Sequence, residues 1–210
     1  MNTPIRDAVE IILREYLAIA ELRAHPVAPV FAELERLLAA ARPVLARPML
    51  RLRWSMGRFN RPARIPWLAM LDRRETRSVR YGLYCDYLFR EDMSGVYLSF
   101  SQGVAAMTDA YGTGAARELL AADCRALRDR YRHHSPRLRY ERIDLRTTTP
   151  LGKSYEESSI ANLFYPANAV PEDAVLLEDL EEMLSLYDRY LEDKGEWSLP
   201  SLQNPASRSL

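Results

Sequence analysis

VRYGLYCDYLFREDMSGVYLSFS, residues 79–101, is the stretch that decides the fold. Its first half alternates between two sets of side chains: Val79, Tyr81, Leu83, Cys85, Tyr87 and Phe89 on one side, and Arg80, Gly82, Tyr84, Asp86 and Leu88 on the other. A period of two is typical of a β-strand, because successive side chains point to opposite faces. Residues 91–95 follow as a turn ending in glycine, and residues 96–101 return as the partner strand. We therefore expect an antiparallel hairpin at the centre of the fold.

Helical patterns lie on both sides of this hairpin in the sequence. Apolar residues recur at spacings of three and four over residues 5–23, 30–41, 114–132 and 172–193. Further strands are expected at residues 48–54, 65–71, 139–145 and 160–165. Loops are expected at residues 55–62, which contain Gly, Asn and Pro, and at the Thr-rich residues 147–152.

These elements predict an α+β fold, with a mostly antiparallel twisted sheet, flanking helices, two N-terminal helices and a long C-terminal helix. We expect one domain over residues 1–197, with a helical part at 1–47 and a sheet-and-helix part at 48–197. Residues 198–210 are rich in Ser, Pro and Asn, which is typical of a flexible tail or linker.

Composition bounds the class of protein. The chain has 210 residues with 48% hydrophobic content, enough for one well-buried core. It contains no apolar run of membrane-spanning length and no signal-peptide pattern, so we expect a cytoplasmic protein that does not contact a membrane. Cys85 and Cys124 are expected to be reduced, buried thiols, and the few histidines do not have the spacing of a zinc site. We expect neither a metal nor a cofactor.

The net charge is zero, but the charges are unevenly distributed. Residues 36–71 contain no acidic side chain, whereas they include Arg36, Arg42, Arg47, Arg51, Arg53, Arg58, Arg61 and Arg64. The balancing acidic residues are concentrated between residues 172 and 196. The guanidinium group is a planar donor fork that suits phosphate oxygens and base edges, so the arginine segment is compatible with DNA binding. A GC-rich genome, which favours arginine codons, explains the overall arginine bias equally well.

Catalytic signatures are missing from the sequence. It has no GxxxxGK[ST] phosphate loop and no G-x-S-x-G nucleophile elbow. Glu141, Asp144 and Lys153 look superficially like a metal-dependent nuclease triad, but their order and spacing do not fit one. The glycines at 112 and 114 are explained by the start of a helix. We therefore expect a recognition domain, not an enzyme.

Several separated motifs carry a specific resemblance. In order along the chain, they are WSMGRFN at 54–60, IPWLA at 65–69, YGLY at 81–84, YLF at 87–89 and GVYLSFSQG at 95–103. Together they resemble the N-terminal domain of McrB proteins, the DNA-recognition subunits of modification-dependent restriction systems. The resemblance implies that the chain binds duplex DNA containing 5-methylcytosine or a related modified cytosine. It also implies that the modified nucleotide is flipped out of the duplex into an aromatic pocket.

The resemblance assigns this base pocket to Trp67, Tyr84 and Leu88. The alternation at 83–89 puts Tyr84 and Leu88 on one strand face, so both can contact one base. Asp86 lies between them on the same face. Its carboxylate is expected either to accept a hydrogen bond from the exocyclic amine of cytosine or to pair with an arginine of a strand.

The resemblance also implies a loop that enters the gap left by the flipped base, made here by Gly57, Arg58, Phe59 and Asn60. Either Arg58 or Phe59 would be the inserted side chain. The phosphate contacts are expected from Arg51, Arg53, Arg61 and Arg64.

The implied partners are modified double-stranded DNA, a motor domain in a longer chain and a separate nuclease subunit. Any GTPase or nuclease activity would then lie in those other domains or subunits. The alternative interpretation is a protein-interaction adaptor without nucleic-acid binding, whose sheet and acidic last helix dock a partner.

Overall fold

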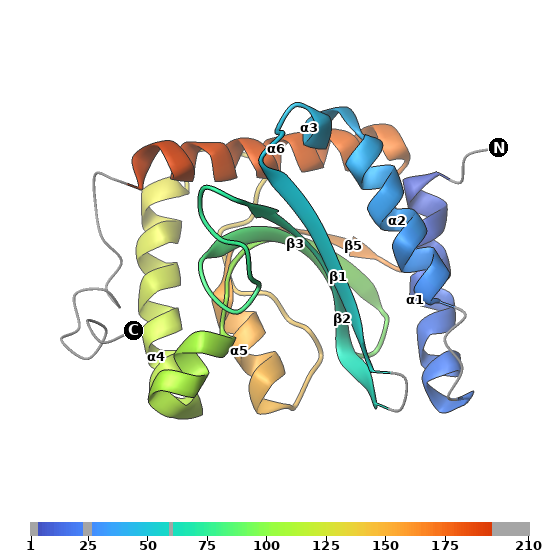
Figure 1. The fold of residues 1–210 in the computed structure, drawn as a ribbon, viewed down its shortest axis with the longest axis horizontal. Helices are drawn as coiled ribbons and strands as arrows, with labels where there is room; N and C mark the ends of the chain where they lie inside the picture. Colours follow the sequence, from blue (N-terminus) through green and yellow to red (C-terminus); the bar gives the residue numbers. More distant parts are fainter. Residues whose placement is uncertain (1–3, 23–26, 59–60, 195–210) are drawn as a thin grey trace.

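The computed structural model describes residues 4–22, 27–58 and 61–194. Its centre is a five-stranded antiparallel sheet in which the strands are ordered as they occur in the sequence (Figure 1). The strands are β1 (Leu50–Arg58), β2 (Arg61–Asp72), β3 (Leu83–Phe89), β4 (Gly95–Gln102) and β5 (Ser159–Pro166). The α+β class and the antiparallel sheet are thus confirmed.

Six helices surround the sheet in the described part of the chain: α1 (Ile5–Leu22), α2 (Ala28–Ala40), α3 (Arg42–Leu45), α4 (Ala105–Tyr131), α5 (Pro150–Ser158) and α6 (Asp173–Asp193). Figure 1 shows α1 and α2 side by side at one end of the molecule, α4 at the other, and α6 running between the two ends. α5 lies next to α4, beneath the sheet in this view. The two N-terminal helices and the long C-terminal helix were expected from the sequence.

The alternation at 83–89 divides the side chains of β3 between two environments. Leu83, Cys85, Tyr87 and Phe89 join the main hydrophobic core, together with apolar residues of α1, α2, α4 and α6. The Tyr187 hydroxyl of α6 donates to the Leu83 carbonyl at 2.6 Å, which ties this helix to the sheet. The other set, Tyr84, Asp86 and Leu88, is also buried but lies on the opposite face of the sheet, where Leu88 and Tyr84 belong to two smaller apolar clusters.

Arg47 shows that part of the arginine segment is structural. Its guanidinium pairs with Glu181 at 2.8 Å and with Asp188 at 2.7 Å, and its side chain is only 11% exposed. These bonds fasten the segment after α3 to α6, so some of the acidic residues of the last helix are used within the fold.

The prediction of a loop at 55–62 is wrong for most of its length. β1 continues to Arg58 and β2 begins at Arg61, while residues 59–60 lie outside the described part. Gly57 makes this possible, because it has a φ of +86° next to a β-bulge between Ser55 and Gly57. A Cβ at this position would overlap the backbone nitrogen of Ala63 on the facing strand. Turn-forming residues therefore mark a bulged hairpin here instead of an irregular loop.

Residues 139–145 do not form the expected strand; only an isolated bridge joins Arg139 to Asn162. Two backbone N–H groups of this segment bond to side chains and not to a neighbouring strand. The Tyr97 hydroxyl accepts from the Asp144 N–H, and the Glu156 carboxylate accepts from the Leu145 N–H. The prediction of a loop at 147–152 is also wrong at its end, because α5 starts at Pro150. Thr149 caps this helix by accepting from the Gly152 N–H at 3.1 Å.

Two smaller corrections concern glycines. The strand expected from residue 79 begins only at Leu83, after Gly82 with a φ of +74°. The helix expected from residue 114 begins at Ala105 and is interrupted at Gly112, which has a φ of +75°. Gly112 is therefore a kink within α4 and not the start of a helix.

Cys85 and Cys124 are free and buried, as expected. Within the described ranges, none of the helices has both the length and the hydropathy needed to cross a bilayer. The predicted tail at 198–210 and the domain limit at 197 fall outside the residues that the structure describes.

Candidate nucleic-acid interface

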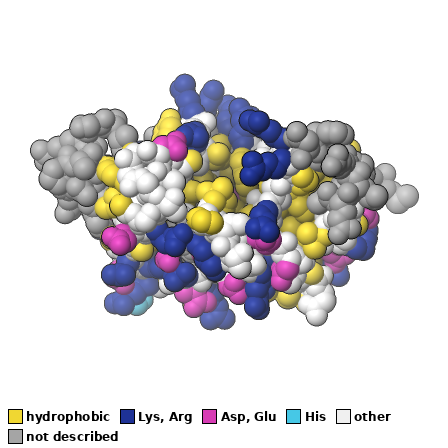
Figure 2. Space-filling model, turned by 90° about the horizontal axis from the view of Figure 1, so that it is seen from below, with side chains coloured by type: hydrophobic (Ala, Val, Ile, Leu, Met, Phe, Trp, Pro, Cys, Tyr) yellow, Lys and Arg dark blue, Asp and Glu magenta, His cyan; other side chains and the backbone are white. Residues whose placement is uncertain are grey.

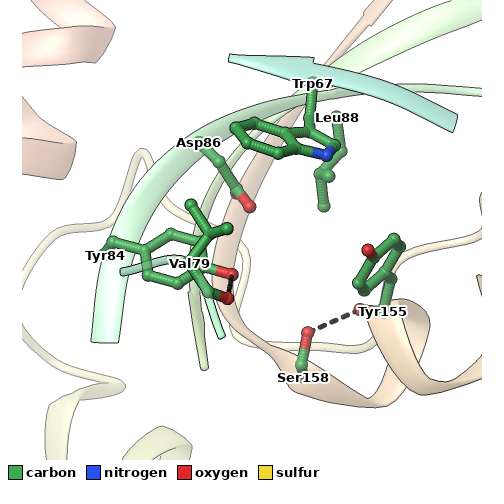
Figure 3. Close-up of a pocket in the computed structure, with 7 residues that line it drawn as sticks. All are labelled: Trp67, Val79, Tyr84, Asp86, Leu88, Tyr155 and Ser158. Carbon is green, nitrogen blue, oxygen red and sulfur yellow. Dashed lines mark hydrogen bonds between the residues drawn. The ribbon is translucent and has the colours of Figure 1, made fainter. Parts of the chain in front are cut away.

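A small pocket lies on the sheet face opposite the main core (Figure 3). The four predicted pocket residues meet there: Trp67 from β2, and Tyr84, Asp86 and Leu88 from β3. Antiparallel pairing explains why, since Trp67 is the register partner of Leu88 and Ala69 that of Asp86. The remaining wall comes from Val79, before β3, and from Tyr155 and Ser158 of α5.

The pocket is narrow and its walls are well fixed on one side. Its volume is about 30 Å³, which is room for one or two water molecules. The Tyr84 hydroxyl donates to the Val79 carbonyl at 3.0 Å, and burial raises the pKa of this tyrosine well above its usual range. The Ser158 hydroxyl donates to the Tyr155 carbonyl at 2.9 Å. Trp67 is half-buried, whereas Tyr84 and Leu88 are buried.

Asp86 brings a carboxyl group into this apolar surrounding, and its side chain points into the pocket in Figure 3. The residue is only 4% exposed, and its Oδ1 accepts a hydrogen bond from the Ser101 hydroxyl at 3.0 Å. Burial raises the pKa of Asp86 well above its usual range, and the Ser101 bond offsets only part of that rise. Among the described residues, no arginine forms an ion pair with Asp86.

A wider groove adjoins the pocket and shares Trp67 and Tyr155 with it. Its volume is about 410 Å³, and its walls are residues 61–65 of β2 on one side and the start of α5 on the other. Figure 2 shows Lys and Arg side chains gathered around an apolar hollow on this side of the molecule. The pocket therefore opens beside a groove with a basic rim.

The four arginines predicted to contact phosphate are all exposed on or near this face. Arg61 and Arg64 line the groove, and Arg64 pairs with Glu91 at 3.1 Å. Arg51 and Arg53 lie on the neighbouring edge strand β1, on the pocket face, because they pair in register with Leu71 and Ala69. Arg51, Arg53 and Arg61 form no ion pair with a described residue.

Sequence reasoning missed two further arginines. Arg73 and Arg77, from the segment between β2 and β3, join Arg51 and Arg53 around a recess of about 200 Å³. We call these four residues the edge arginine cluster. The run of arginines after Asp72 in the sequence could have indicated this cluster. Arg74 of that run is not part of it, because it pairs with Asp72 at 2.8 Å and stabilises the turn.

The β1–β2 hairpin tip carries the residues predicted to enter the duplex. Gly57 and Arg58 are exposed at its end, while Phe59 and Asn60 lie outside the described part. The Tyr16 hydroxyl of α1 donates to the Ala63 carbonyl at 2.7 Å and contacts the Met56 carbonyl at 3.1 Å, so it holds both strands of the hairpin. Burial raises the pKa of Tyr16 to about 12, which keeps the phenol a donor.

Two of the residues that looked like a nuclease triad, Asp144 and Lys153, have other partners. Lys153 bonds to Glu156 at 2.7 Å, and Asp144 pairs with Arg146 at 3.1 Å. In the described ranges, no cluster of three or more His, Cys, Asp or Glu side chains could hold a metal ion.

Comparison with known families gives a match. The sequence model of the family described as "MrcB-like, N-terminal domain" matches residues 12–192. No curated protein and no solved structure matches the chain.

Proposed function

The chain belongs to the family of MrcB-like N-terminal domains, and we propose that it binds duplex DNA carrying a modified cytosine, 5-methylcytosine or a close relative. Membership of the family supports a role in DNA recognition within a restriction system. In the proposed reaction cycle the domain makes and breaks no bond. A motor domain in a longer chain and a separate nuclease subunit would do so after recognition.

The observation that carries this proposal is the joining of the aromatic pocket to the arginine-rimmed groove through Trp67 and Tyr155. A base rotated out of a duplex needs flat side chains against its ring and an apolar surface for a methyl group. Trp67, Tyr84 and Leu88 offer both. The distorted phosphate backbone needs cations close by, and Arg61 and Arg64 line the adjoining groove.

The hairpin tip is suited to the second half of the flipping step. A flipped base leaves a gap in the stack, which an inserted side chain can fill. The exposed position of Arg58, beyond the Tyr16 anchor, supports a role of residues 57–60 in filling that gap. Either Arg58 or Phe59 would be the inserted residue.

Fluorescence anisotropy with four otherwise identical duplexes tests the proposal. They carry cytosine, 5-methylcytosine, 5-hydroxymethylcytosine or N4-methylcytosine at one position, and a neighbouring 2-aminopurine reports unstacking. We expect tighter binding and brighter 2-aminopurine with at least one modified duplex. Equal affinity for all four duplexes would overturn the proposal, and no binding to any of them would favour the adaptor interpretation.

A pair of variants at one position provides the matched control. Trp67→Ala removes the stacking wall and should weaken binding to the preferred duplex by about 5- to 150-fold, since stacking on an aromatic side chain is worth about 1–3 kcal/mol. Trp67→Phe keeps a flat ring and should recover most of that loss. If both variants bind as the unchanged protein does, Trp67 is not part of the base pocket.

A further inference from the structure

Asp86 is the ionisable group that the stacking argument does not use. It lines the pocket with 4% exposure, so its carboxyl group would meet the edge of any base that stacks there. One oxygen, Oδ1, is occupied by the Ser101 hydroxyl. No described residue donates a hydrogen bond to the other oxygen, Oδ2. The carboxyl group therefore has one fixed oxygen and one that is available to a ligand.

A chain of serine hydroxyls fixes the role of Oδ1. Ser101 bonds to Ser99 at 2.9 Å, and Ser99 bonds to Ser159 at 2.9 Å. Because a hydroxyl has only one proton, donation by Ser101 to Oδ1 requires that Ser99 donate to Ser101 and Ser159 to Ser99. All three hydroxyls thus point their protons toward Asp86 and reinforce one another. A proton bound to the carboxyl group consequently belongs on Oδ2.

The surroundings favour that bound proton. The groups that face Asp86 are Tyr84 on its own strand, Trp67 on β2, Ser101 on β4, and Tyr155 and Ser158 on α5. None of them is a cation, so the Ser101 hydrogen bond alone, among these groups, offsets the cost of a buried carboxylate charge. Burial accordingly raises the pKa of Asp86, as described above, and stabilises the neutral acid.

The next inference rests on the proposed function. We propose that Asp86, in its neutral carboxylic-acid form, recognises the flipped base: Oδ2–H donates to the ring nitrogen N3 of cytosine, and Oδ1 accepts from the exocyclic amine. The ligand class is a base that presents an amine beside an acceptor nitrogen, as cytosine and its C5-substituted derivatives do. Thymine presents the reverse order, an N3–H donor beside an acceptor oxygen. To pair with it, Asp86 would need its proton on Oδ1, where Ser101 already donates. Ser101 is therefore a positioning residue for discrimination against thymine.

Two substitutions of Asp86 separate this role from packing. Asp86→Leu removes both polar contacts, and binding to the 5-methylcytosine duplex should fall at least tenfold. Asp86→Asn offers an amide whose oxygen can accept from Ser101 and whose nitrogen can donate to N3, so it should restore most of that loss. The carboxyl group and the amide differ in one measurable respect. Affinity of the unchanged protein should fall about tenfold per pH unit once Asp86 ionises, whereas the Asn variant should show no such fall.

Ser101→Ala tests the positioning role. This variant should lower the preference for 5-methylcytosine over thymine at the same duplex position by several-fold, mainly by strengthening thymine binding. Ser94→Ala, at an exposed hydroxyl that bonds to Asp92, is the control and should leave the preference unchanged. An unchanged preference in Ser101→Ala would refute the role given to the serine chain.

A readout without DNA completes the test. Carbon-13 NMR of the aspartate carboxyl groups, with Asp86 assigned by its loss in Asp86→Asn, should find this group still protonated in the free protein at a pH where the exposed aspartates are ionised. An ionised Asp86 at that pH, or an Asn variant as weak as the Leu variant, would overturn the carboxylic-acid mechanism. If the modified duplexes still bind better than the unmodified one, the proposed function survives that result. If no duplex binds, both fall.

Discussion

The edge arginine cluster predicts a specific change in the salt dependence of DNA binding. Arg73 and Arg77 are exposed and form no ion pair with a described residue, so their charges are available to phosphates. Each phosphate that a protein neutralises contributes about 0.9 to the slope of log affinity against log salt. Replacing both with Ala should therefore reduce that slope by about 1.8. Between about 50 and 200 mM salt, the unchanged protein should lose roughly 12-fold more affinity than the double variant.

Fluorescence anisotropy with modified and unmodified duplexes over that salt range measures the effect. Phosphate contacts carry no sequence information, so both duplexes should weaken by the same factor at low salt. Arg36→Ala is the matched control, because Arg36 is on α2 and already pairs with Glu33 at 2.7 Å. An unchanged slope in the double variant, or a weakening confined to the modified duplex, would refute the reasoning.

Two further predictions concern stability. Tyr16→Phe removes the hydroxyl that holds both strands of the β1–β2 hairpin, which should lower the free energy of unfolding by about 1–2 kcal/mol. Hydrogen exchange should become faster in the hairpin, and unaltered exchange there would contradict the anchor. Because burial raises the folded-state pKa of Asp86, its contribution to stability is complete below the unfolded pKa, about 4, and is lost as pH rises toward the folded value. Urea unfolding in that window should show the free energy of unfolding falling by about 1.4 kcal/mol per pH unit, and Asp86→Asn should remove this fall. Parallel pH profiles for the two proteins would rule out this contribution of Asp86.

Strand periodicity predicted the two faces of the central sheet. The alternation at 83–89 separated the core side chains from Tyr84, Asp86 and Leu88 before any tertiary information was used. It worked because β3 is an interior strand, buried on both faces, with large side chains on each. The strand expected at 139–145 does not form, because the backbone there bonds to side chains of β4 and α5. The spacing of side chains along the sequence does not reveal which groups form hydrogen bonds with the backbone N–H and C=O groups.

The residues that α5 contributes to the pocket were not predicted from the sequence, for a different reason. Tyr155 and Ser158 reach the pocket from α5, a nine-residue helix whose first residues fall in the loop expected at 147–152. Its start has a recognisable signal, Thr149 as the cap followed by Pro150 in the first turn. The helix is short, however, and its packing against α4 and the sheet, which the sequence does not reveal, stabilises it. Arg73 and Arg77 were missed for a related reason, since their neighbours Arg51 and Arg53 are about twenty residues distant in sequence and adjacent only after β1 and β2 pair.

The narrowness of the pocket indicates where a base would enter. Its volume is only about 30 Å³, so in the proposed function we expect one wall to move when a base enters. Tyr84 is held by the Val79 carbonyl and Asp86 by Ser101, which makes the β3 side the fixed wall. The side chains of Trp67 and Tyr155 form no hydrogen bond with any described residue and are held by packing alone.

Trp67 and Tyr155 are also the two residues that separate the pocket from the arginine-rimmed groove. We therefore expect the wall that moves to be the one beside the groove, where the phosphate backbone would lie in the proposed complex. In the proposed complex, contacts between the DNA backbone and Arg61 or Arg64 would form in the groove and offset the free energy of parting the two rings. Until they part, the two rings help to keep Asp86 away from bulk water, and in the proposed mechanism this burial would retain the proton on its carboxyl group until the base arrives.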